Sequence, residues 1–461
     1  MQGMIQERMQ LPGRAENVFL FIGLVWGLLF CFVTPPFQVP DENSHLFRIV
    51  QIAEGGVVSE ANNGAVGGWI PKSIFVCGRS TRFVWRDENL KISAQQLKEL
   101  WQIRLEPDNR VFAELGSMAA YSPVPYLPAA AVCRVSLWFN ARPMVMLYAS
   151  RMLTCLCWIG LMYAAVRISP VQKWVMAFLA LLPGSIYAGG SVSADAATNG
   201  LAFLTFSLYL YFVYGHCRRI GWGNWLAAVL VTVCLSLSKS VFFPFCFLFL
   251  FVPGQRFSSP ARRISCLVCL VAANLIAVGL WGYAVKSLSI NWGNNIDLAR
   301  QLEFIFSNPL SYAATLGQSM FGRFMKYLIG YFARFGWGDT PLPWWQYPCW
   351  GLTLAWLVCR DGALEVKVAL RDRIVFVLLC VFSIVEIFTL IYLSWNPVGS
   401  RFVEGVQGRY FIGLGPVLAA AFCSRRFSIN SRLEKCFIAG FLILFLSLAL
   451  WRVAERFYEF C

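Results

Sequence analysis

Eleven apolar stretches divide this 461-residue chain, and most are long enough to cross the roughly 30 Å hydrocarbon core of a membrane as helices. Charged residues make up only 14% of the chain, whereas soluble domains contain about 25%. The sequence therefore predicts an all-α polytopic membrane protein, with residues 1–461 forming a single integral membrane domain. The expected spans are 18–33, 144–166, 173–190, 196–215, 222–237, 240–252, 264–287, 344–360, 373–395, 408–423 and 435–452.

The charges on the linkers between these stretches predict the topology. Basic residues predominate in one set of linkers, which the positive-inside tendency places in the cytoplasm together with the N-terminus. This tendency also accounts for the formal net charge of +15, so no nucleic-acid partner is expected. Two long segments with balanced charge, 34–143 and 288–343, are expected outside, flanking a helical bundle at 144–287 and preceding C-terminal spans at 344–452. The basic linkers contain Arg8, Arg167, Arg218, Arg262, Arg371, Arg425 and Arg426.

Two segments differ from ordinary spans. Segment 121–143 would place the basic linkers outside if it crossed the membrane, and its prolines and Arg134 favour a helix lying at the membrane surface. The pair at 222–252 is short for two spans of about 20 residues, which predicts a hairpin of half-length helices.

The segment that follows the first span, PPFQVPDENSHLFR (35–48), concentrates residues able to carry chemistry. Its prolines favour an extended chain, and a helix is expected to begin near Pro40. On that helix Asp41, Glu42 and His45 are spaced to share one face. Such a face could supply a carboxylate base, or it could bind Mg²⁺ or Mn²⁺ with His45 as a further ligand. The alternative is that the two acids only cap the helix and His45 is solvated.

Three later segments add candidates at the same predicted membrane face. Asp195, in SVSADAATNG, is either a second functional acid or the N-cap of the next helix. Lys239, in SLSKSVFFPF, either binds a ligand or anchors the chain at the interface. Arg409 could hold a phosphate or pair with a neighbouring acid. It opens a late span together with Gln407 and Tyr410.

Segment 288–343 is rich in aromatic residues, as in SINWGNN and YLIGYFARFGWGDTPLPWW. Aromatic side chains gather at membrane interfaces, and they can also stack on sugar rings. For residues 318–335 the pattern favours an interfacial amphipathic helix.

The strings PPFQVPDENSHLFR, YSPVPYLPA, SVSADAATNG, LSLSKS and QGRYF, in this order, resemble a family of predicted bacterial inner-membrane proteins that is associated with surface-polysaccharide synthesis. A first span followed by a large outer loop that starts with Asp-Glu is also similar to the GT-C superfamily of membrane glycosyltransferases. The resemblance covers roughly residues 18–450. It implies a GT-C-like bundle of about 11 transmembrane helices, with juxtamembrane helices in a large first periplasmic loop.

For function, the resemblance implies inverting transfer of a sugar, with glucose expected, from a polyprenyl-phosphate donor to a surface polysaccharide such as O-antigen or to a lipid-linked glycan. The reaction would take place on the periplasmic side of the bacterial inner membrane. In GT-C enzymes an acid of the first outer loop acts as the base or helps to hold a cation. Here that role falls on Asp41, with Glu42 as alternate, and Asp195 takes the role of a second acid. The donor phosphate would be bound by Arg409 or Lys239, beside His45, Gln407 and Tyr410.

Two other functions stay open on the sequence alone. The chain could be a flippase or another transporter for the same lipid-linked sugar, although transporters commonly contain internal repeats and none is evident here. It could also be an O-antigen polymerase. A polymerase handles two lipid-linked chains and is expected to need more basic outer surface than segments 34–143 and 288–343 supply.

Overall fold

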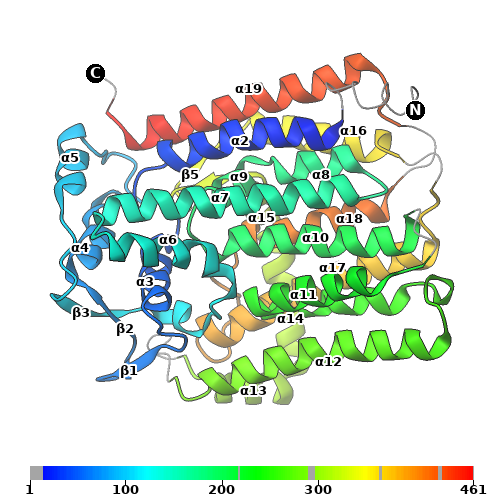
Figure 1. Ribbon diagram of the computed structural model, residues 1–461, viewed down its shortest axis with the longest axis horizontal. Coiled ribbons are helices and arrows are strands. Elements are labelled where there is room, and N and C mark those ends of the chain that lie inside the picture. Colours follow the sequence, from blue (N-terminus) through cyan, green and yellow to red (C-terminus); the bar gives the residue numbers. More distant parts are fainter. Residues whose placement is uncertain (1–13, 216–218, 289–295, 363–365, 424–427, 460–461) are drawn as a thin grey trace.

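Long helices run side by side in this protein, and a smaller layer of short elements covers one end of them (Figure 1). The computed structural model describes residues 14–215, 219–288, 296–362, 366–423 and 428–459. Within these ranges six helices are long and apolar enough to span a membrane. They are α2 (Ala15–Val33), α7 (Pro143–Ile168), α10 (Ala194–Tyr214), α12 (Pro260–Val285), α17 (Leu370–Trp395) and α19 (Arg432–Phe457).

All of the eleven predicted spans coincide with helical structure, although several are shorter or broken. Segment 173–190 divides into α8 and α9 at Pro183, because proline has no N–H to continue the helical ladder. Segment 222–252 forms the predicted hairpin, but its second arm is a 3-10 helix. Six helices meet the length and hydropathy of a span, so a total of eleven crossings stays a prediction. The shorter elements are α8 (Lys173–Ala180), α9 (Pro183–Gly189), α11 (Trp222–Ser238), η4 (Ser240–Phe251), η5 (Gly254–Arg256), α16 (Gln346–Arg360), η6 (Gly408–Leu414) and α18 (Gly415–Ala421).

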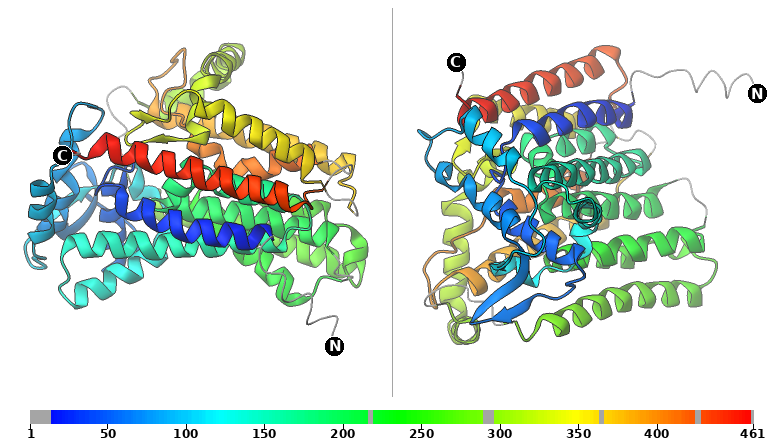
Figure 2. Two further views of the ribbon diagram at one scale, coloured as in Figure 1. Left: turned by 90° about the horizontal axis from the view of Figure 1, so that it is seen from above. Right: turned by 60° about the vertical axis from the view of Figure 1, so that its left-hand side comes forward.

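The helix α10 lies at the centre of the bundle. It packs against α7, α11 and η6, and it is the most buried of the six long helices. The helices α2 and α19 pack together on one side of the bundle (Figure 2). By contrast, α12 packs mainly on α11 and η4 and leaves most of its apolar surface exposed. An exposed apolar face of this kind is the one expected to meet lipid.

The layer that covers one end of the bundle, here called the end layer, comprises residues 34–138 (Figure 2, right). It contains a three-stranded antiparallel sheet in the order β1-β2-β3, a feature that the all-α prediction did not include. Asn63 and Gly64 form the two-residue turn between β1 and β2, both with positive φ (48° and 79°). Asn-Gly is the pair favoured in such a hairpin turn. The elements of the end layer are α3 (Glu42–Ala53), β1 (Glu60–Asn62), β2 (Ala65–Pro71), α4 (Lys72–Ser80), η1 (Arg82–Val84), α5 (Ala94–Gln102), β3 (Arg110–Glu114), η2 (Gly116–Ala120), η3 (Val124–Tyr126) and α6 (Leu127–Trp138).

Segment 121–143 does not cross the bundle. Its helix α6 has 12 residues and packs against α3 and α7. At 1.5 Å per residue it is about 18 Å long, too short for a hydrocarbon core of roughly 30 Å. The helix α6 alone is therefore too short to be a span, and its place at the membrane surface stays a prediction.

The second long segment is also built from short elements. The predicted amphipathic helix at 318–335 is divided between α14 and α15, whose boundary lies at Arg323. These elements are α13 (Leu298–Ser307), α14 (Pro309–Gly322), α15 (Phe324–Phe332), β4 (Arg334–Phe335) and β5 (Thr340–Pro341). Several residues used in the sequence predictions lie outside the described ranges, namely Arg8, Arg218, Trp292, Arg425 and Arg426.

Candidate active site

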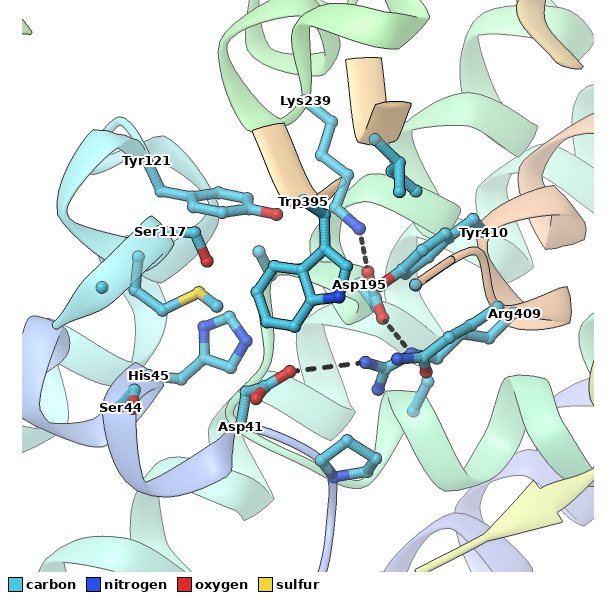
Figure 3. Close-up of a pocket in the computed structure, with 18 of the residues that line it drawn as sticks. Asp41, Ser44, His45, Ser117, Tyr121, Asp195, Lys239, Trp395, Arg409 and Tyr410 are labelled. Carbon is cyan, nitrogen blue, oxygen red and sulfur yellow. Dashed lines mark hydrogen bonds and ion pairs between the residues drawn. The ribbon is translucent and has the colours of Figure 1, made fainter. Parts of the chain in front are cut away.

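A cavity of about 1270 Å³ lies where the end layer meets the bundle. Seven of the eight site residues predicted from the sequence line it, although they come from four separate parts of the chain. Figure 3 labels all of these seven except Gln407. The seven are Asp41, His45, Asp195, Lys239, Gln407, Arg409 and Tyr410. The eighth, Glu42, is not part of the lining.

The charged residues reach the cavity because each stands where a helix begins or ends. Asp41 precedes the first turn of α3, and Asp195 lies in the first turn of α10. Lys239 is the extended residue between α11 and η4, and Arg409 is in the first turn of η6. Helix ends leave backbone groups without helical partners, so polar side chains and ligands are favoured there.

Two acids and two cations form one ionic network in the cavity wall. Lys239 Nζ pairs with Asp195 Oδ1, and Arg409 Nε lies 3.5 Å from Asp195 Oδ2. Arg409 Nη2 also lies 3.7 Å from Asp41 Oδ2, so this guanidinium bridges the two acids (Figure 3). The ring of Tyr410 packs below both cations, with its centroid 5.0 Å from Lys239 Nζ and 5.6 Å from Arg409 Cζ. The ring thereby fixes the cations in place while leaving them open to the cavity.

The two acids differ in the number of their ionic contacts and in the exposure of their side chains. Both carboxylate oxygens of Asp195 have a cationic partner, and its side chain is only 10% exposed. The side chain of Asp41 is 38% exposed and has one ionic contact at longer range. Burial raises the pKa of Asp41 above its ordinary value of 3.8, the charge of Arg409 opposes this shift, and the charge of Asp195 adds to it. Asp41 is therefore the acid better suited to accept a proton from a ligand.

His45 faces the same cavity as a neutral group. Its Nδ1 lies 2.7 Å from the hydroxyl of Tyr126, and the ring of Tyr121 stands edge-on at 6.2 Å. Burial lowers the pKa of His45 to about 3, so the imidazole carries no charge near neutral pH. His45 can therefore accept or donate a hydrogen bond, but it adds no positive charge to the site.

The predicted face of three metal ligands does not form. Glu42 is fully buried and its carboxylate binds Arg151 on α7, with Oε1 2.8 Å from Nε and Oε2 2.5 Å from Nη2. Asp41 has φ of 65° and stands outside the helix, so the spacing that placed it beside His45 on one helical face does not apply. No group of three or more His, Cys, Asp or Glu side chains suited to a metal ion occurs within the described ranges. With Asp195 held by two cations, these residues do not fit a divalent cation, which needs carboxylate oxygens free to coordinate it.

A family model described as a predicted membrane protein, DUF2142, matches residues 24–418. The chain belongs to this family. The match confirms that this DUF2142 chain is a membrane protein, as its resemblance to a family of predicted membrane proteins had indicated. Comparison with curated proteins and with solved structures found no match.

Several residues of the site in this DUF2142 protein escaped the sequence analysis. Tyr121 lines the cavity and Tyr126 bonds His45, but the string YSPVPYLPA drew attention for its prolines instead. Arg151 lies within a predicted span, and a charged residue at membrane depth is costly unless it is paired. By that rule the sequence alone could have identified Arg151 as the partner of a buried acid.

Proposed function

We propose that this protein is a glycosyltransferase of the GT-C type, which moves a sugar from a polyprenyl-phosphate donor to a glycan acceptor at the outer face of the bacterial inner membrane. The observation that carries the proposal is the bridge of Arg409 between Asp41 and Asp195 on the cavity wall. A base and a phosphate-binding cation are the two groups that this reaction needs, and here they are adjacent.

In the proposed reaction Asp41 takes the proton from an acceptor hydroxyl while the acceptor oxygen forms a bond to the anomeric carbon. The bond from this carbon to the phosphate oxygen breaks, and its electron pair stays on the phosphate. Arg409 and Lys239 offset the charge that develops on this leaving group. Because the acceptor enters opposite the leaving group, a single displacement inverts the anomeric centre. Glucose is the sugar we propose, as the resemblance implied.

Apolar side chains that line the cavity suit the isoprenoid part of such a donor. Val278 and Trp281 contribute from α12, and Ile387, Leu390 and Ile391 contribute from α17. Leu390 is 41% exposed, so these apolar side chains are accessible to a ligand. A lipid-linked donor could therefore place its phosphate beside Arg409 while its chain stays in an apolar environment.

A polymerase that joins lipid-linked glycans is the second candidate, and one observation favours it. The two long segments have balanced charge overall, but the cavity wall is basic, because Arg79, Arg82 and Arg86 line it without acidic partners in the part of the chain that the structure describes. The expectation that a polymerase needs a basic outer surface is thus met locally. Both candidates use the same proposed base and the same cations.

The test is sugar transfer in membranes that contain the wild type, Asp41→Asn, Asp195→Asn or the control Glu60→Gln, matched for protein by immunoblot. Glu60 is an exposed carboxylate on β1 and does not line the cavity. With radiolabelled polyprenyl-phosphate glucose as donor, we expect Asp41→Asn to lower transfer by about 10²–10⁴-fold, the usual contribution of a general base. Glu60→Gln should transfer at the wild-type rate.

Two results would count against the proposal. Normal transfer by Asp41→Asn would move the base elsewhere, with Asp195 next in line. No transfer by the wild type from several polyprenyl-phosphate sugars would instead favour the polymerase, or a flippase for the same lipid.

A further inference from the structure

Three arginines form a second cationic surface in the cavity, here called the arginine wall: Arg79, Arg82 and Arg86. All three line the cavity, although Arg79 lies in α4, Arg82 in η1 and Arg86 in the loop that follows η1. None of the three forms an ion pair within the described ranges of the chain. Burial and the charge of Arg79 lower the pKa of Arg82, so at least these two like charges repel one another and a bound anion would relieve that repulsion.

The backbone of the arginine wall is fixed against the segment that carries Asp41. A Cβ atom on Gly78 would lie 2.5 Å from the ring of Phe47, so α4 can approach α3 this closely only with glycine there. The Thr81 hydroxyl donates to the Pro36 carbonyl at 2.8 Å, and the Gln38 amide donates to the Thr81 carbonyl at 3.1 Å. The backbone of the arginine wall therefore has a fixed position relative to the segment that carries Asp41.

The loop after η1 is held from the other side by a buried arginine of α19. Arg456 is 3% exposed and donates to the carbonyls of Val84, Asp87 and Leu90 at 2.8, 2.9 and 3.0 Å. Arg86 lies between these anchors with φ of 58°, a left-handed conformation that costs a non-glycine residue of the order of 1–3 kcal/mol. The anchors sustain that conformation and keep Arg86 on the cavity lining.

Aromatic rings orient the guanidinium groups. Arg82 Cζ lies 4.6 Å from the ring of Trp85, and Trp85 packs against Trp337 with ring centroids 3.8 Å apart and ring planes tilted by 32°. Arg79 Cζ lies 4.4 Å from the ring of Phe75. A guanidinium stacked on a ring still presents its N–H edge to a ligand, which allows two-point contact with a phosphate or a carboxylate.

We propose that the arginine wall binds the glycan acceptor through phosphate or carboxylate groups, and that the acceptor is therefore anionic. This inference rests on the proposed function only in naming the ligand the acceptor. The wall is separate from Arg409 and Lys239, which the donor phosphate would occupy.

Cavity size and charge support a second ligand. The volume of about 1270 Å³ exceeds the roughly 300–1,000 Å³ of a single small-molecule site. The charge of Arg86 acts on Asp41 and lowers its pKa, so the near end of the wall is close to the proposed base. Of the other acids of the lining, Asp339 pairs with Arg456 and Glu404 pairs with Arg323, while Glu114 forms no ion pair with the three arginines within the described ranges. An anionic acceptor held here would have its hydroxyl groups near Asp41.

The test is equilibrium binding of defined anions to the purified full-length protein in nanodiscs, followed by tryptophan fluorescence at low salt. The probes are inorganic pyrophosphate, a galacturonic acid hexamer and the uncharged maltohexaose. The test variant is Arg82→Gln/Arg86→Gln, and the matched control is Lys98→Gln/Arg104→Gln, which removes the same charge from exposed positions outside the cavity. Arg79→Gln serves as a second variant if the double variant does not elute as a single species.

At least one anionic probe should bind the wild type, with maltohexaose binding far more weakly. The test variant should weaken that binding by about tenfold or more, as expected for the loss of charge-assisted bidentate contacts, and the control should not. Preference for pyrophosphate would indicate a lipid-pyrophosphate acceptor, and preference for the hexamer an acidic sugar; each supports the proposal. Equal loss in both double variants, or no binding of either anion, would overturn it. No donor is involved, so this result stands apart from the transfer assay.

Discussion

The adjacent carboxylates Asp41 and Glu42 are expected to have opposite effects when each is changed to its amide. Glu42 is fully buried and binds Arg151 through both oxygens, at 2.8 and 2.5 Å, and it also accepts from the Phe37 N–H at 3.1 Å. Asp41 has a side chain that is 38% exposed to the cavity and one ionic contact at 3.7 Å. Glu42 should therefore stabilise the fold, whereas Asp41 should act on the ligand.

The magnitude follows from what each substitution leaves behind. Glu42→Gln leaves the Arg151 guanidinium charged and buried, and removal of one partner of a buried pair costs about 3–5 kcal/mol. Arg151 keeps three other acceptors, the carbonyls of Cys31, Thr34 and Pro35 at 3.0, 2.7 and 2.9 Å, which favour the lower end of this range. Asp41→Asn removes a long and partly exposed contact and should cost less than about 1 kcal/mol.

The assay is unfolding of purified protein by SDS in mixed micelles, with sugar transfer measured per folded molecule in the same preparations. Glu42→Gln should lower the free energy of unfolding by about 3 kcal/mol while the folded fraction keeps its activity. Asp41→Asn should unfold like the wild type and lose transfer. The double variant Glu42→Gln/Arg151→Met should be less destabilised than the sum of its single variants, because it leaves no charge unpaired. If Glu42→Gln unfolds within about 1 kcal/mol of the wild type, the ion pair is no more than a surface contact and the reasoning fails.

Three further outcomes are expected of the same site. Transfer should rise with pH through an apparent pKa above 3.8, because Asp41 must lose its proton to act as base and burial raises the pKa of Asp41. The pKa of His45 is lowered to about 3, so its imidazole is neutral near pH 7. A limb of the pH–rate profile near 6.5 that is assigned to His45 would contradict this. Gly408→Ala would bring a Cβ within 2.1 Å of the α15 backbone and displace the turn that carries Arg409, so transfer and thermal stability should both fall. The matched control is Gly440→Ala, whose Cβ would meet nothing within 4 Å, and it should change neither property. Arg409→Lys keeps the charge but loses the fork that reaches both acids, and the KM for the donor should rise about tenfold; an unchanged KM would argue for a simple charge effect.

The spans and the positions of the candidate residues could be predicted from the sequence, because both are local properties. Length and hydropathy mark a membrane helix, and a charged residue such as Lys239 or Arg409 stands out where an apolar stretch begins or ends. The different positions of Asp41, which faces the cavity, and Glu42, which is buried in an ion pair, could not be predicted in this way. It depends on the left-handed backbone of Asp41 and on Arg151, a residue 109 positions away that approaches Glu42 only in the folded chain.

The end layer shows two different limits. The sequence Asn63-Gly64 is a recognisable signal for a hairpin turn, so part of the sheet could have been predicted from the sequence. It was not predicted because the whole segment was interpreted as a loop with helices. The arginine wall carried a visible spacing, but the absence of acidic partners among the described residues is a three-dimensional property. Spacing identifies residues that can act together, and only packing decides whether their charges are already satisfied.

The bridge formed by Arg409 also links donor binding to the strength of the base. In the ligand-free site Arg409 lowers the pKa of Asp41, since the nearby cation favours the charged carboxylate. A donor phosphate bound by Arg409 would offset that positive charge and bring a second anion near Asp41, and both effects raise the pKa of Asp41 and make it the stronger base. The acid limb of kcat, which reports the enzyme–substrate complex, should therefore lie at higher pH than the acid limb of kcat/KM, which reports the free enzyme. Arg409→Gln should reduce this separation, because the carboxylate would then lack the cation in both states. Coincident limbs in the wild type would mean that Arg409 does not couple the phosphate to Asp41.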